Sequence, residues 1–104
     1  MTEKQKCQCD EICDYYGIES QKGILMEECA ELIQAVSKLT RAEQGGKTFD
    51  KTSAKLNLAE ECADVTIMMW QILSYYFGCE AKKRLDYFIS QKLTRQMDRI
   101  KSNQ

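Results

Sequence analysis

Two short acidic segments of the chain nearly repeat each other, EECAE at Glu27 to Glu31 and EECAD at Glu60 to Asp64. Carboxylates three residues apart project from the same face of a helix, so each segment can present a pair of acids to one partner. In a partly dry site such acids raise one another's pKa and lose hydration, unless a cation compensates their charge. Four or more carboxylate oxygens suit the hard cations Mg²⁺ and Mn²⁺. The sequence therefore predicts a metal site.

Each acidic pair falls within the apolar stripe of an expected helix. The first stripe consists of Ile24, Leu25, Leu32, Ala35 and Val36, and the second of Leu58, Val65, Met68 and Ile72. Glu28 and Glu31 lie in the first stripe, and Glu61 and Asp64 lie in the second. Antiparallel packing of the two stripes is expected to bring these four carboxylates together inside a bundle. The alternative is a solvated acidic face, which helices often carry.

The elements that must position these acids are all predicted to be helices. Proline is absent and there are only five glycines, a composition that favours long helices. Hydrophobic periodicity predicts helices over Glu11–Tyr16 and over about Ser20–Ala42, Ser53–Tyr76 and Glu80–Ile100. The segment EQGGKTFDKTS is an expected loop, and Gly78 is the expected C-terminal stop of the third helix. No segment alternates as a strand does, so the predicted fold class is all-α.

Length and charge limit the kinds of protein this chain can be. The 104 residues fit a single domain over 1–104, and residues 1–8 are expected to be flexible because they are polar and charged. The formal net charge of −1 offers no basic field for nucleic acid. No apolar run approaches the length of a membrane span, and no signal peptide is recognisable. A cytoplasmic protein without nucleic-acid or membrane partners is therefore expected.

The six cysteines are interpreted as thiols, since no secretory signal accompanies them. The cluster CQCDEIC, with Cys7, Cys9 and Cys13, suggests half of a zinc site. Zinc normally takes four ligands, and the chain has no histidine and no second cysteine cluster, so free thiols are the preferred interpretation. Cys29 and Cys62, within the acidic motifs, are expected to be small core residues.

The patterns EExxE at Glu27–Glu31 and ExxD at Glu61–Asp64 resemble the signature of the MazG-like nucleotide pyrophosphohydrolases. This all-α family includes dimeric dUTPases, dCTP pyrophosphatases and phosphoribosyl-ATP pyrophosphohydrolase. The resemblance covers about Lys22 to Arg99, including the apolar neighbours in EECAELIQAV and LAEECADVTIMM. It implies a four-helix MazG-like bundle completed by oligomerisation, as a homodimer or homotetramer. A di-iron bundle, the alternative, normally needs Glu-x-x-His on two helices, and this chain has no histidine.

Carried over to this chain, the resemblance implies that Glu28, Glu31, Glu61 and Asp64 bind Mg²⁺, with Mn²⁺ as a substitute. It also implies hydrolysis of a nucleoside triphosphate between the α- and β-phosphates, which gives a monophosphate and pyrophosphate. Glu27 is the candidate for orienting or deprotonating the attacking water.

Cationic and polar candidates for substrate binding lie outside the acidic motifs. Lys92 and Arg95 occupy positions comparable to those that the family uses against phosphates. Solvated charges near a helix C-terminus are the alternative for both. Asn57, one turn before Glu61, is a candidate for contact with sugar or base, or for a helix cap. Two other functions stay open: a non-catalytic helical interaction protein, and a pyrophosphohydrolase of another nucleotide such as phosphoribosyl-ATP.

Overall fold

The regular structure of the chain is entirely helical. A computed structural model describes residues 1–45 and 50–104. Its elements are α1 (Glu3–Tyr16), α2 (Ile18–Glu43), α3 (Lys51–Phe77), the short 3₁₀ helix η1 (Gly78–Glu80) and α4 (Ala81–Ser102). No strand occurs in these two segments, so the predicted all-α class is confirmed. None of the helices within them combines the length and the apolar character needed to cross a membrane.

The first helix begins at Glu3 rather than near Glu11, because its N-terminus is capped. The Thr2 hydroxyl accepts a hydrogen bond from the Gln5 backbone N–H at 3.1 Å, and the Gln5 side chain accepts one from the Thr2 N–H at 2.8 Å. This reciprocal capping box satisfies two backbone donors at the helix start. Helix α1 therefore includes residues 3–8, most of the segment for which the sequence predicts flexibility.

The two long helices that carry the acidic motifs begin and end within two residues of the predicted bounds. Asp50 caps α3, since its carboxylate accepts a hydrogen bond from the Ser53 N–H at 2.9 Å. Gly78 ends α3 with φ of 57°, a backbone conformation that glycine adopts without the Cβ clash of other residues. Of the expected loop between α2 and α3, residues 46–49 lie outside the described segments.

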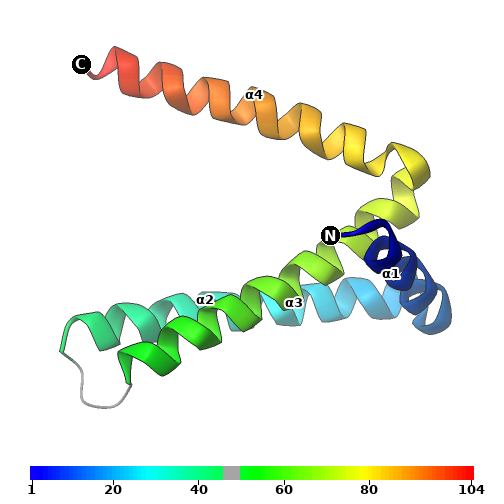
Figure 1. Ribbon diagram of the computed structural model, residues 1–104, viewed down its shortest axis with the longest axis horizontal. Helices are drawn as coiled ribbons and strands as arrows, with labels where there is room; N and C mark the ends of the chain where they lie inside the picture. Colours follow the sequence, from blue (N-terminus) through cyan, green and yellow to red (C-terminus); the bar gives the residue numbers. More distant parts are fainter. Residues whose placement is uncertain (46–49) are drawn as a thin grey trace.

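Helices α2 and α3 lie side by side and antiparallel (Figure 1). Their contact includes Ala35 on α2 and Ala54 on α3, which are almost fully buried. Farther along the pair, the buried Gln21 side chain donates a hydrogen bond from Nε2 to Oε1 of Gln71 at 2.8 Å. Small side chains let the helices approach closely, while the amide pair favours one alignment along their length.

Helix α4 diverges from the other helices (Figure 1). A small core near its start joins Cys9 of α1, Trp70 of α3 and Ala81 of α4. Beyond that core, α4 makes no contact with α2 among the described residues, so a single chain does not close a four-helix bundle. The radius of gyration is 17.0 Å, against about 13 Å for a compact domain of this length. The exposed area of 7916 Å² likewise exceeds the roughly 6,000 Å² of a compact monomer of this mass.

Candidate metal centre

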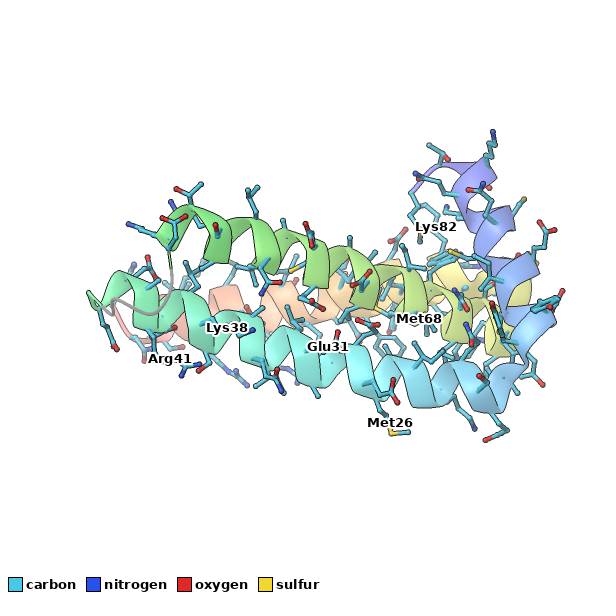
Figure 2. The ribbon with its side chains drawn as sticks, turned by 90° about the horizontal axis from the view of Figure 1, so that it is seen from below. Met26, Glu31, Lys38, Arg41, Met68 and Lys82 are labelled. Carbon is cyan, nitrogen blue, oxygen red and sulfur yellow. The ribbon has the colours of Figure 1, made fainter. Side chains whose placement is uncertain are left out.

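The acidic motifs meet where α2 packs against α3. Glu28 and Glu31 project from α2, and Glu61 and Asp64 project from α3 at the same level of the helix pair. Figure 2 shows Glu31 between the two helices, whereas Met26 projects from the opposite side of α2. Glu28 and Glu61 are half-buried in this contact, whereas Glu31 and Asp64 are exposed.

Three carboxylates converge closely enough to share one cation. Glu28, Glu31 and Glu61 each offer an oxygen, and these oxygens all lie within 4.8 Å of one another. These three side chains are referred to below as the carboxylate cluster. One oxygen of Glu28 and one of Glu61, both Oε2, are shielded from solvent and have no hydrogen-bond partner. Buried acceptors normally find a donor, so this pair of unpartnered oxygens indicates an interaction still to be made.

The electrostatics of the cluster also favour an added positive charge. Burial raises the pKa of the Glu28 carboxyl above its ordinary value of 4.5, and the charges of Glu31 and Asp64 raise it further. The same causes, in the same order, raise the pKa of Glu61. Asp64 lies outside the group of three, yet its charge acts on both half-buried carboxyls. Together the four predicted ligands form one interacting set whose repulsion a cation would relieve.

The other acidic residues of the motifs lie outside this set. Glu27 and Glu60 are exposed, and on a helix each points about 100° away from the acid that follows it. Asn57 is half-buried on α3 one turn before Glu61, and the helix cap is Asp50. The capping alternative for Asn57 is therefore wrong, whereas its proposed contact with substrate stays a prediction.

The predicted cationic residues do not reach the acids within one chain. Lys92 and Arg95 are exposed on α4, and α4 extends away from α2 and does not contact it in the described segments (Figure 1). Their predicted role against phosphates therefore requires another copy of the chain or a different position of α4.

The cysteines are free thiols, as predicted, but two are placed differently. Cys9 and Cys13 lie on the buried face of α1, whereas Cys7 on the same helix is exposed. Cys29 and Cys62 are exposed and do not belong to the core, which corrects the sequence-based expectation.

One residue near the cluster has no counterpart in the sequence-based prediction. Lys38 is half-buried on α2, and Figure 2 shows it on the side of the helix that carries Glu31. The sequence feature that could have identified Lys38 is its position seven residues after Glu31. Two helical turns return a side chain to nearly the same face of the helix.

No protein family, curated protein or solved structure matches this chain. The likeness to the MazG-like enzymes therefore depends on the two acidic motifs and on their placement at the contact between α2 and α3.

Proposed function

We propose that this protein is a Mg²⁺-dependent pyrophosphohydrolase of nucleoside triphosphates. The observation that carries the proposal is the convergence of Glu28, Glu31 and Glu61, with two shielded oxygens that have no partner. Carboxylate oxygens without nitrogen or sulfur ligands favour a hard cation over zinc or iron. The residues present therefore fit Mg²⁺, and Mn²⁺ would serve in its place.

In this proposal the carboxylate cluster and Asp64 hold the cation. When bound, it would supply positive charge that offsets the negative charge developing on the phosphate and would make a nearby water more acidic. Glu27 is exposed, and its position four residues before Glu31 places it about 40° from that residue around the helix, where it would accept a proton from a water at the edge of the site. The substrate is then cleaved between its α- and β-phosphates, giving a nucleoside monophosphate and pyrophosphate.

The proposed active form is a homodimer or a larger homo-oligomer. The chain exposes about 1,900 Å² more than a compact monomer of its mass, an excess typical of one partner in an obligate interface. Much of the unburied apolar surface lies on α4, where the exposed residues include Phe88, Ile89, Leu93, Met97 and Ile100. A second copy that covers this stripe would complete a helical bundle and would give Lys92 and Arg95 a route to the acids.

Pyrophosphate release from a panel of ribo- and deoxynucleoside triphosphates tests the activity. We expect Mg²⁺-dependent release of pyrophosphate together with the monophosphate from at least one nucleotide. Glu61→Gln should lower turnover by about 100-fold or more, because a metal ligand acts on charge that grows in the transition state. Glu60→Gln removes the same charge one residue away and should have a much smaller effect. Equal losses in both variants, or no release from any nucleotide, would reject the proposal.

The exposed stripe on α4 also favours a second candidate, a non-catalytic helical interaction protein. An apolar helix face of this length fits a groove or another helix as well as it fits a second copy. The two candidates differ in what the acids do. An interaction protein would retain its partner when Glu61 is replaced by glutamine, and it would release no pyrophosphate.

A further inference from the structure

Lys38 lies on the edge of the α2–α3 contact that also carries Glu31. The two residues are seven positions apart, which places them about 20° apart around the helix and about 10.5 Å apart along its axis. Helical side chains lean towards the N-terminus of their helix, so the lysine stem leans towards Glu31. Figure 2 shows both side chains on the side of α2 that faces α3.

The side chains of α3 that lie across from Lys38 are small or polar. Gln21 and Gln71 are hydrogen-bonded and set the antiparallel alignment. Lys38 lies 17 residues after Gln21 and Ala54 lies 17 residues before Gln71, so these two are level with each other. The half-buried Asn57 lies seven residues before Asp64, just as Lys38 lies seven residues after Glu31.

The ammonium group of Lys38 has no assigned counter-charge. Lys38 is half-buried, yet it makes no hydrogen bond or ion pair with any residue in segments 1–45 and 50–104. By comparison, Lys6, Lys22 and Lys82 each pair with an acid on their own helix. Among the described residues, the side-chain nitrogen and oxygen atoms that are buried without a partner belong to Gln21, Glu28 and Glu61, so the Lys38 ammonium reaches solvent while its stem is partly covered. An unpaired ammonium in this position is accessible to an anion.

We propose that Lys38 binds the β- and γ-phosphates of the substrate, the part that leaves as pyrophosphate. This assignment rests on the proposed function and extends it, because it fixes the direction of the triphosphate along the helix pair. With the reacting phosphate at the carboxylate cluster, the leaving phosphates run along α2 towards Lys38. One divalent cation neutralises only part of a triphosphate's charge, and Lys38 supplies a further positive charge from the same chain. Lys92 and Arg95 require a partner copy for that purpose.

The test is calorimetric titration of the full-length protein with inorganic pyrophosphate in the presence of Mg²⁺. No nucleoside is involved, so the unknown base preference does not enter. Lys38→Gln should weaken pyrophosphate binding by about tenfold or more, the effect of losing a hydrogen bond to a charged group. Lys38→Arg should recover part of the affinity. Lys55→Gln removes the same charge from an exposed position on α3, about 100° around the helix from the buried Ala54, and should bind like the parent protein.

The outcomes separate the role of Lys38 from the proposed function itself. If Glu61→Gln abolishes pyrophosphate binding while Lys38→Gln binds normally, the proposed site stands and the role of Lys38 is rejected. If Glu61→Gln also binds normally, the metal-dependent site is rejected and the role of Lys38 with it. A different result is expected if Lys38 only stabilises the fold by offsetting the negative charge of the acids. In that case Lys38→Gln would lower the melting temperature without metal and leave pyrophosphate affinity unchanged, which overturns the proposal.

Discussion

The α2–α3 pair and helix α4 differ in which side chains they direct inwards and which they expose. The pair directs acids inwards, and two of their oxygens are shielded without a donor. Helix α4 directs apolar residues outwards, and only Ala81 at its start is fully buried. In the pair the groups without a partner are carboxylate oxygens, whereas on α4 they are apolar side chains.

This contrast shows that the two regions are incomplete for different physical reasons. A cation relieves repulsion and desolvation at the acids, and its effect depends on pH and on metal concentration. A second helix face removes apolar area from water, and its effect depends on protein concentration. The two deficiencies can therefore be tested separately, in the acids and on α4.

The largest effect is expected from a charge on the apolar stripe of α4. Leu93→Glu should weaken self-association by about 10³-fold or more, because an unpaired carboxylate would be buried in the interface. Gln91→Glu adds the same charge about 200° around the helix from Leu93 and should leave the assembly intact. Sedimentation at micromolar concentration distinguishes the two variants. A mass of 12.1 kDa for the unaltered protein, that of one chain, would show that α4 has no partner copy.

The next largest effect concerns the acid just outside the α2–α3 contact. Glu27→Gln should lower the turnover of pyrophosphate release by about 100-fold, the usual contribution of a general base. The Michaelis constant should change little, since Glu27 lies outside the carboxylate cluster. If Glu27→Gln behaves like Glu60→Gln, both exposed acids are solvated and the base must be sought elsewhere.

A smaller effect on catalysis links the two regions. Lys92→Ala should lower kcat/KM by about tenfold if α4 of another copy brings this lysine to the phosphates. Lys83 is the matched control, because it lies nine residues earlier and so about 180° around the same helix. Equal activity in Lys92→Ala and Lys83→Ala, with the oligomer intact, would limit α4 to assembly.

The smallest effect is a shift of a few degrees in thermal unfolding. The pKa of Glu28 and that of Glu61 are raised on folding, so the folded protein binds more protons than the unfolded chain above pH 4.5. The stability that these groups contribute is present below that pH and is lost as the pH rises through the raised values. In EDTA, Glu28→Gln should therefore lose less stability than the parent protein on going to neutral pH.

Addition of Mg²⁺ at neutral pH should raise the melting temperature of the parent protein more than that of Glu28→Gln. Asp50 has the opposite effect on the pH dependence of stability. The Ser53 N–H lowers the pKa of Asp50, so the stability that this carboxylate contributes is lost as the pH falls. Asp50 is the same in both proteins, so the difference between their melting curves isolates the cluster. Identical curves for the two proteins would contradict the convergence of the acids.

Several features of the fold and site were predictable because local rules determine them. Helical periodicity gave the bounds of α2 and α3, and the spacing of three residues put Glu28, Glu31 and Glu61 on the packed faces. The early start of α1 was also readable, since Thr2 and Gln5 have the spacing of a capping box.

Other features depend on which faces the chain covers, and local rules do not determine that. Cys29 and Cys62 are exposed, because the described parts of α1 and α4 leave these positions of the pair uncovered. The apolar spacing on α4 predicts a helix face suited to burial. It does not predict that the apolar residues of this face are exposed within one chain. Lys38 was missed because a single lysine on a helix usually lies in solvent.

The hydrogen bond between Gln21 and Gln71 has a consequence for how homologous sequences should differ in length. Gln21 stands ten residues before Glu31, and Gln71 stands ten residues after Glu61, so the amide pair aligns the acids from the end remote from the α2–α3 connection. Insertions in that connection can then accumulate with little effect on the acids, since the free-energy cost of a longer connection rises only slowly with its length. One residue gained or lost between Gln21 and Glu28 would instead turn the acids by about 100°. Evolutionary gaps are therefore expected within residues 44–50 and absent from 21–31 and 61–71, which an alignment of homologues would check.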